Sequence, residues 1–172
     1  TRNYGLKALL NIAGYSKIDS TTISFGVAPR INACGRMGNA DDALNLLLSD
    51  NLADATEKAK NIISYNNARQ KYEKKIYEDA IKQIEEKNLV NSNSIVLGGD
   101  GWHHGVIGIV ASKITDLYYK PCILICFEDG SDIGKGSGRS IKGFDLHKAL
   151  MRCKDTLQGF GGHSMAIGLS VK

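Results

Sequence analysis

The sequence predicts an α/β fold, with a small mixed β-sheet flanked by helices, preceded by a long connecting helix and a short helical tail of an upstream domain. Three observations predict it. Residues 92–172 alternate short apolar runs with helical patterns, the order that builds a sheet with helices packed on it. Residues 51–91 contain neither Pro nor Gly and repeat apolar residues at helical spacing. Residues 1–50 mix short helical patterns with a segment rich in Gly and Arg.

Within the first 50 residues, the gathering of glycines and arginines predicts a loop from Gly26 to Gly38. A short apolar helix is predicted over residues 43–48. Asn39 and the carboxylates Asp41 and Asp42 precede it, and negative charge favours a helix N-terminus because of the helix dipole.

The long helix is predicted to begin at Asn51, whose side chain can accept an N–H of the first turn. Asp54 stands three residues later, in a position that resembles a capping box. A helix of this length exceeds the usual range, which indicates a connector between two lobes. The polar run Asn66–Gln70 interrupts its apolar stripe, and a solvated patch on the connector explains it.

The last 80 residues are expected to hold the sheet and its helices. Gly98–Gly101 and Glu128–Gly130 are predicted to be turns, Pro121 opens a strand, and Asp145 caps a helix. Strands are predicted over residues 94–98, 122–127, 133–139 and 165–171, and helices over residues 106–117 and 146–150.

Composition sets limits on the class of protein. Hydrophobic residues make up 42% and charged residues 23%, which is ordinary for a globular domain and excludes a disordered chain. The net charge of +4 permits a polyanionic partner without requiring one. No run of 18 apolar residues is present, so we expect no membrane partner and a cytoplasmic location. The chain opens on Thr1, so we expect an excised piece of a longer protein. The four cysteines lack regular spacing, which favours free buried thiols over disulfides.

Three glycine-rich segments are candidates for phosphate binding. Arg30 and Arg36 flank the first, and guanidinium groups bind phosphate oxygens through two hydrogen bonds, although either arginine can equally brace its own loop. The second runs from Gly134 to Ser140, where backbone N–H groups, hydroxyls and an arginine suit a terminal phosphate, although such a segment is often only a turn. It is not a Walker A loop. The third, Gly159–His163, suggests a bare backbone ledge beside one histidine, and a lone histidine is usually structural.

Adjacent His103 and His104 raise the question of a metal site. A structural metal needs about four convergent ligands, and no supporting carboxylate or Cys/His spacing lies nearby. His103 at a helix N-terminus can instead donate to a phosphate or pin the loop. Hydrolysis of phosphoesters with metals uses clustered Asp and His ligands, and the sequence has no Asp-x-Asp or Asp-His-His cluster. We therefore expect phosphate-binding features without a hydrolytic centre and no metal site in this chain.

Taken together, these motifs resemble the C-terminal part of the RecJ family of single-strand-specific DNA exonucleases. Nearly the whole chain takes part in the resemblance, and the motifs occur in the family's order. They are Ala28–Ala33 with Gly35-Arg36 (P-R-I-N-A-x-G-R), Asn66 with Arg69-Gln70 (N-x-x-R-Q), Trp102-His103 with Gly105–Ser112 (W-H-x-G-V-x-G-I-x-A-S), Ser137–Ser140 (S-G-R-S), and Gly161–His163 with Ala166 and Gly168 (G-G-H-x-x-A-x-G).

The resemblance implies a phosphoesterase (DHH) domain whose tail is residues 1–50, a connecting helix over 51–91, and a DHH-associated domain over 92–172. It implies that Ser137 and Arg139 bind a DNA 5′-phosphate and that Arg30 holds the adjacent backbone. The residues expected to bind phosphate or nucleic acid are Arg30, Arg36, His103, Ser137, Gly138, Arg139, Ser140, Gly161, Gly162 and His163. The metal ions of the whole enzyme, Mn²⁺ or Mg²⁺, are expected on the missing upstream domain, so this piece alone is expected to be inactive.

The function expected from the resemblance is the substrate-binding portion of a 5′→3′ exonuclease used in DNA recombination and repair. Two alternatives remain at this point. One is an oligoribonuclease or cyclic-dinucleotide phosphodiesterase of the same superfamily, and the other is a non-catalytic nucleic-acid-binding module. Aromatic residues make up 7% of the chain, which disfavours a base-stacking platform.

Overall fold

The structure is a computed structural model that describes residues 2–15, 18–127 and 130–172. It has the mixed α/β fold that the sequence predicts, and its contacts divide it into two compact units, Thr1–Lys71 and Tyr72–Lys172. The helix α4 (Leu52–Glu86) runs through the boundary and contributes to both units. None of the described helices is long and apolar enough to cross a membrane.

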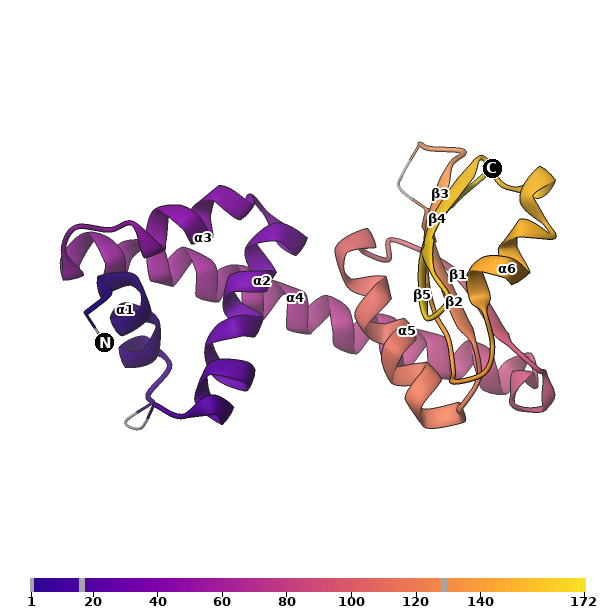
Figure 1. Ribbon diagram of the computed structural model, residues 1–172, viewed down its shortest axis with the longest axis horizontal. Coiled ribbons are helices and arrows are strands. Elements are labelled where there is room, and N and C mark those ends of the chain that lie inside the picture. Colours follow the sequence, from indigo (N-terminus) through magenta and orange to yellow (C-terminus); the bar gives the residue numbers. More distant parts are fainter. Residues whose placement is uncertain (1, 16–17, 128–129) are drawn as a thin grey trace. The chain divides into compact units, whose positions relative to one another are not determined.

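The first unit is helical (Figure 1). Besides the first half of α4 it contains α1 (Tyr4–Ile12), a π-helix η1 (Thr22–Val27), α2 (Ala28–Met37) and α3 (Ala40–Leu47). Apolar side chains from all of these elements form one core. Leu9, Leu46 and Ile62 are completely buried in it. The predicted helix after Asn39 is α3, and the Asn39 side chain caps it by accepting the N–H of Asp41.

The loop predicted from Gly26 to Gly38 is wrong, because this segment is helical. Pro29 lies in the first turn of α2, where its missing N–H group is not needed. Gly38 ends the helix, and a Cβ atom there would lie 2.6 Å from the Tyr65 ring. The glycine at this position therefore permits close packing on α4, so the composition that suggested a loop reflects helix packing.

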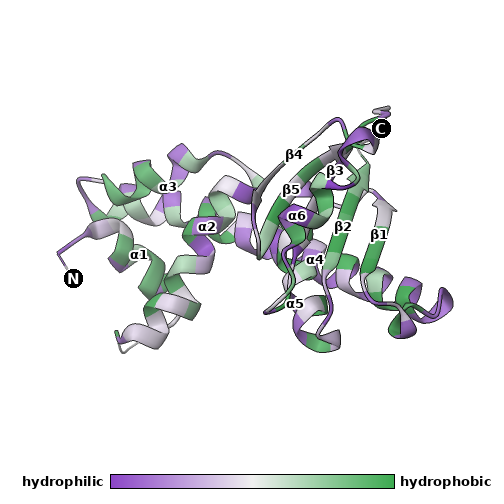
Figure 2. Ribbon diagram, turned by 45° about the vertical axis from the view of Figure 1, so that its right-hand side comes forward, coloured by the Kyte–Doolittle hydropathy of each residue, from purple (hydrophilic) through white to green (hydrophobic). Residues whose placement is uncertain are grey.

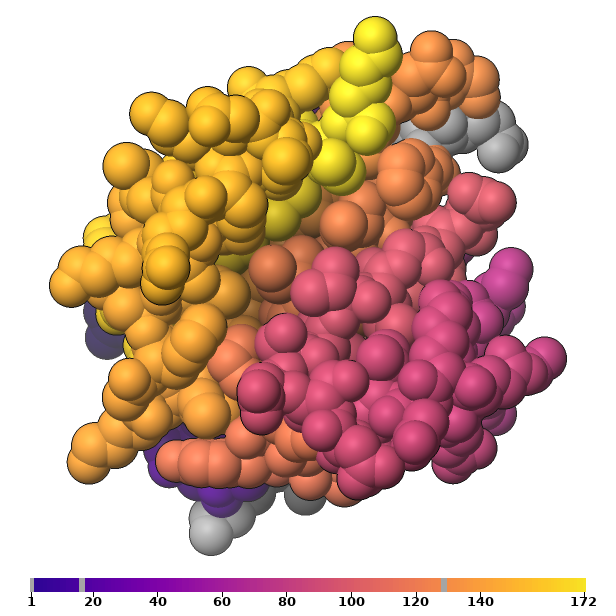
Figure 3. All heavy atoms as spheres, turned by 90° about the vertical axis from the view of Figure 1, so that its right-hand side faces the viewer, coloured from indigo at the N-terminus to yellow at the C-terminus, as the bar shows by residue number. Residues whose placement is uncertain are grey.

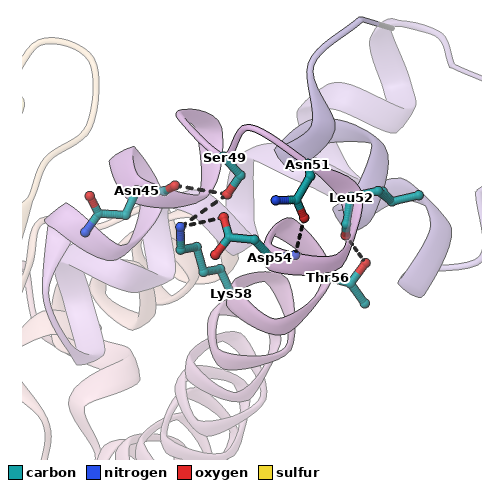
Figure 4. A network of polar contacts seen from close by, with 7 residues as sticks. All are labelled: Asn45, Ser49, Asn51, Leu52, Asp54, Thr56 and Lys58. Atoms are coloured by element: carbon teal, nitrogen blue, oxygen red, sulfur yellow. Dashed lines mark hydrogen bonds and ion pairs between the residues drawn. The ribbon is translucent and has the colours of Figure 1, made fainter.

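The start of α4 is held by a small polar network, shown in Figure 4. Asn51 accepts the N–H of Asp54 at 2.9 Å, which confirms the predicted cap. Lys58 donates to Asp54 Oδ2 at 2.7 Å and to the Ser49 hydroxyl at 3.4 Å. Hydrogen bonds to the Asp54 carboxylate, first of all the one from Lys58, lower the pKa of Asp54. With a rise of about 1.5 Å per residue, the 35 residues of α4 extend about 50 Å.

The second unit contains a mixed sheet, which among the described residues has five strands in the order β1-β2-β3-β5-β4. The strands are β1 (Ile95–Asp100), β2 (Cys122–Phe127), β3 (Gly134–Arg139), β4 (Gly159–His163) and β5 (Ala166–Val171). Of these five, β1 and β2 pair in parallel, the other pairs are antiparallel, and α5 (His104–Tyr118) connects β1 to β2. The predicted cap at Asp145 is confirmed at the start of α6 (Leu146–Met151), where it accepts the N–H of Lys148.

One prediction for this unit needs correction, and a second is confirmed. Gly159–His163 was expected to be a ledge that feeds the last strand, but it is the edge strand β4, paired with β5. Ser137–Arg139 belongs to β3, an inner strand, which confirms the strand predicted over residues 133–139 rather than the turn considered for the glycine-rich segment. In both strands, backbone pairing with β5 outweighs the weak strand preference of glycine. The predicted turn at residues 128–130 lies partly outside the described residues.

The two faces of the sheet carry different helices (Figure 1). Leu146 and Leu150 of α6 pack on Ile123, Ile167 and Leu169, which share one face. The helix α5 lies on the opposite face, where Gly108 approaches β3. In Figure 2, β2 is hydrophobic along its whole length, as expected for a strand with a helix over each face.

The α6 side of this unit faces the viewer in Figure 3, with α6 in orange beside the pink segment that leads from α4 into β1. An apolar hollow of about 140 Å³ lies between α6 and the first two strands, lined by Val96, Ile123 and Phe144 among others. The described residues that line this hollow include none of the predicted phosphate-binding residues.

Candidate phosphate-binding site

The register of the sheet brings four of the predicted residues to one face. Side chains alternate along β3, so Ser137 and Arg139 point to the same side as α5. Ser137 pairs with Gly168 of β5, which in turn pairs with Gly161 of β4. One row further along, Arg139 pairs with Ala166, which pairs with His163. Two rows thus run across three strands on the same face.

The middle of these rows consists of small residues, which we name the small-residue strip: Gly161, Ala166 and Gly168. Gly161 and Gly168 are exposed, and Ala166 is partly buried. Among the described residues, a Cβ atom on Gly161 would have no neighbour within 4 Å, and one on Gly168 would meet only the Gly136 carbonyl, at 3.9 Å. The space above the strip is therefore open, and a ligand can lie directly on the backbone.

Arg139 and Ser137 form one polar edge of this strip. The Nη1 atom of Arg139 donates to the Ser137 hydroxyl oxygen at 3.1 Å and to the Gly138 carbonyl at 2.8 Å. Because the Ser137 oxygen accepts from Arg139, its own O–H hydrogen can be directed to an anion. A guanidinium with a hydroxyl beside it is a donor set that suits a phosphate group.

His163 lies at the other edge of the strip and is exposed. It is two strands away from Arg139, so their Cα atoms are about 10 Å apart at the usual strand spacing. A ligand that spans the strip can therefore contact both side chains at once.

Three other predicted residues of this segment hold the framework. Gly138 points to the α6 face, where a Cβ atom would lie 2.7 Å from Ile167. Gly162 has a φ of +136°, and a Cβ atom there would lie 2.3 Å from the Ala166 carbonyl oxygen. Ser140 is buried and its hydroxyl donates to the Phe144 carbonyl at 2.8 Å. These contacts shape β3 and the β4–β5 hairpin that carry the site.

His103 caps α5. Its Nδ1 atom accepts the Gly105 N–H at 3.1 Å, so the ring of the neutral residue carries its proton on Nε2. The His103 ring stacks on the His104 ring, with 5.0 Å between the ring centres, and its centre lies 5.2 Å from that of the Tyr72 ring. The preceding Trp102 is buried and donates to Asp79 Oδ2 of α4 at 2.8 Å. Trp102 thus fixes the loop that positions His103.

Arg30 and Arg36 lie on α2, in the helical unit, whereas the other eight predicted residues lie in the sheet unit. Arg30 donates to the Gly26 carbonyl, and its guanidinium lies 5.9 Å from the centre of the Tyr15 ring. Its buried Nε atom has no hydrogen-bond partner among the residues that the structure describes. Arg36 is partly buried in the last turn of α2.

Clustered metal ligands are absent from the described residues. Across residues 2–15, 18–127 and 130–172, no group of three or more His, Cys, Asp and Glu side chains could hold a metal ion. The neighbours His103 and His104 are therefore a pair without further ligands of this kind within the described part.

Sequence reasoning missed the position of Gly108. It is a buried glycine in the interior of α5, and a Cβ atom there would lie 2.9 Å from the Ser137 hydroxyl oxygen and 3.0 Å from Arg139 Nη2. A glycine within an otherwise good helical pattern was the available signal, because such a residue needs a packing or functional reason.

Comparison with known proteins gives one family and several relatives. The DHHA1 domain family matches residues 69–172. The single-stranded-DNA-specific exonuclease RecJ of Bacillus subtilis is 41% identical over 174 residues, which are 100% of this chain and 22% of that protein. The RecJ of Escherichia coli is 35% identical over 179 residues, covering 98% of this chain and 30% of that protein. The chain thus spans less than a third of the length of these curated relatives.

Solved structures agree with these matches. The crystal structure of RecJ in complex with Mn²⁺ from Thermus thermophilus has a TM-score of 0.86 and 32% identity, and covers 100% of this chain and 25% of that one. A crystal structure of exonuclease RecJ bound to manganese has a TM-score of 0.85 and 32% identity, and covers 98% of this chain and 41% of that one.

Proposed function

The chain belongs to the DHHA1 domain family, and on that premise we propose that it is the substrate-binding portion of a single-strand-specific DNA exonuclease. The observation that carries the proposal is the arrangement of Ser137 and Arg139 beside the open small-residue strip. The names of the relatives support the substrate class. The small-residue strip contacts the sugar–phosphate backbone of the DNA and not its bases, because glycines provide no side chains that could recognise base edges.

In this proposal, Ser137 and Arg139 bind the 5′-phosphate of the strand, and His163 contacts the same strand across the strip. Arg30 and Arg36 of the helical unit bind sugar–phosphate groups of the substrate, and His103 contributes a further donor through Nε2. Binding of the 5′ end gives the whole enzyme 5′→3′ polarity, for use in DNA recombination and repair in the cytoplasm.

The division of labour within the whole protein follows from the same proposal. The upstream phosphoesterase domain ends with residues 1–50. A helix over residues 51–91 connects it to the substrate-binding domain, residues 92–172. Two solved RecJ relatives hold Mn²⁺ and Mg²⁺, which supports divalent metal use by the whole enzyme. Since the described residues contain no group of three or more His, Cys, Asp and Glu side chains that could hold a metal ion, the proposal assigns the metal to the upstream domain. We expect this chain to bind DNA weakly and to cleave none.

The test compares single-stranded oligonucleotides that differ only in a 5′-phosphate or a 5′-hydroxyl, labelled at the 3′ end. Binding to the 172-residue chain is measured by fluorescence anisotropy. Arg139→Ala is expected to weaken binding to the phosphorylated strand about ten- to hundredfold, because a charge-assisted hydrogen bond contributes about 1.5–3 kcal/mol. Binding to the hydroxyl strand should change much less.

Two outcomes would contradict the proposal. Equal losses for both strands would remove the role of Arg139 in binding the 5′-phosphate. Degradation of either strand by the pure chain with Mn²⁺ or Mg²⁺ would contradict the assignment of the metal site to another domain.

A further inference from the structure

The helix α5 comes very close to the candidate site at Gly108. This residue is buried in the interior of the helix. A Cβ atom built on it would lie 2.9 Å from Ser137 Oγ, 3.0 Å from Arg139 Nη2 and 3.6 Å from Ser137 Cβ. The contact at 2.9 Å is shorter than real Cβ atoms show, and the one at 3.0 Å is tighter than most, so both neighbours would have to move. Dispersion is most favourable at about 3.5–4.0 Å, and repulsion rises steeply below it.

Glycine is a poor choice for a helix interior, since alanine restricts the unfolded chain more and exposes less backbone. Its presence at position 108 therefore needs a local reason. Apart from its chain neighbours and the nearby backbone of its own helix, the three atoms nearest to its ideal Cβ position all belong to Ser137 and Arg139. The reason is thus contact with two side chains that we propose to bind phosphate.

The backbones on either side of this contact are fixed. The strand β3 is an inner strand with hydrogen-bonded neighbours on both sides. The helix α5 is tied to α4 by the ion pair of Lys113 with Glu73 at 2.5 Å, and its first turn follows the buried Trp102. A methyl group at position 108 therefore displaces the ends of the Ser137 and Arg139 side chains, which can rotate, and leaves the backbone in place.

We infer that Gly108 is a positioning residue that sets the preference for a terminal phosphate, because its missing side chain lets the Arg139 guanidinium and the Ser137 hydroxyl lie against α5. The inference rests on the proposed function and adds to it a residue on a different element.

The experiment uses Gly108→Ala in the 172-residue chain and the same pair of 5′-phosphate and 5′-hydroxyl oligonucleotides. The quantity measured is the dissociation constant for the 5′-hydroxyl strand divided by that for the 5′-phosphate strand. We expect this ratio to fall about tenfold, because the variant moves charge-assisted donors out of hydrogen-bonding distance. Thermal unfolding should show a native fold, since alanine is the better helix former.

Gly35→Ala is the matched control. Gly35 is an exposed glycine within α2, and among the described residues its ideal Cβ meets only Ala40 Cβ, at 4.0 Å. This variant makes the same change in helix propensity without the contact, so the ratio should stay at the wild-type value.

A double-mutant cycle with Arg139→Ala shows whether Gly108 acts through the arginine. Once Arg139 is absent, Gly108→Ala should change the ratio little further. A wild-type chain without any preference for the 5′-phosphate would overturn the proposed function itself. If the wild type has the preference and loses it with Arg139→Ala, but Gly108→Ala keeps it, the inference about Gly108 is wrong. Loss of the native fold in Gly108→Ala would also overturn it, because the position would then be structural.

Discussion

Substitution of Gly161 by alanine separates binding from stability more clearly than any change of a charged residue. The new Cβ atom meets nothing within 4 Å among the described residues, and Gly161 is not among the glycines with positive φ. The folded state therefore accepts the methyl group without strain. Because alanine restricts the unfolded chain, we expect the free energy of unfolding to rise by about 0.4–1 kcal/mol.

The same methyl group lies where a bound strand would contact the sheet. A ligand at van der Waals distance from the Gly161 Cα atom has to move outward by about 1.5 Å, the length of a carbon–carbon bond. Hydrogen bonds of about 2.8 Å to Arg139 then become longer than about 4 Å, which is beyond hydrogen-bonding distance. Loss of one charge-assisted hydrogen bond predicts binding about ten- to hundredfold weaker.

Fluorescence anisotropy with the phosphorylated oligonucleotide and urea unfolding measure the two effects on the same protein. Gly159→Ala is the control, since its Cβ also meets nothing within 4 Å in the described part of the chain but its row contains Ser170 rather than Ser137 or Arg139. It should give the same stabilisation with wild-type binding. Gly162→Ala should instead destabilise by about 1–3 kcal/mol, because its φ of +136° does not suit alanine. A folded Gly161→Ala variant that binds like the wild type would refute the role of the strip.

Three further predictions concern the framework. Thr115→Val should stabilise the chain by about 1–2 kcal/mol in urea unfolding, because the buried Thr115 hydroxyl has no hydrogen-bond partner among the described residues; a loss of stability would show that the hydroxyl is satisfied. A hydrogen bond from the Lys148 N–H lowers the pKa of Asp145 below 3.8, so the contribution of Asp145 to stability is complete above that pH and is lost as the pH falls through the lowered pKa. Asp145→Asn should flatten the dependence of the free energy of unfolding on pH in this range, and an unchanged pH dependence would contradict this role of Asp145. In the native state a thiol reagent should label only the exposed Cys153, because the other three are buried and burial raises the pKa of Cys122 to about 12; three or four reactive thiols would contradict the packing.

The sequence predicted those elements whose apolar residues follow a clear period. The helix α4 and its Asn51 cap, the strand β2 and the cap of α6 at Asp145 all follow from periodicity and capping rules. The strand β4 was missed because Gly-Phe-Gly-Gly-His has no apolar alternation, and its pairing with β5 is a tertiary property. The helix α2 was missed because Pro and Gly are usual in loops, although Pro also suits a first helical turn.

The site was predictable as a set of residues but not as an arrangement. Glycine, serine and arginine in one segment pointed to an anion, and this requires only side-chain chemistry. That Ser137 and Arg139 share a face with His163 depends on the register of three strands, which local patterns do not determine. The contact of Gly108 with Arg139 depends further on where α5 crosses the sheet.

The strand β4 places part of the candidate site on the region of the sheet that should unfold locally most easily. It is an edge strand composed mostly of exposed residues, paired on one side, and it carries Gly161 and His163. Its amides should therefore exchange with solvent through small openings, whereas those of β3 should exchange only when the sheet unfolds. Since half of the site lies on the part of the sheet that opens most easily, a bound strand should slow amide exchange in β4 far more than in β3, and part of the binding free energy goes into keeping this edge closed.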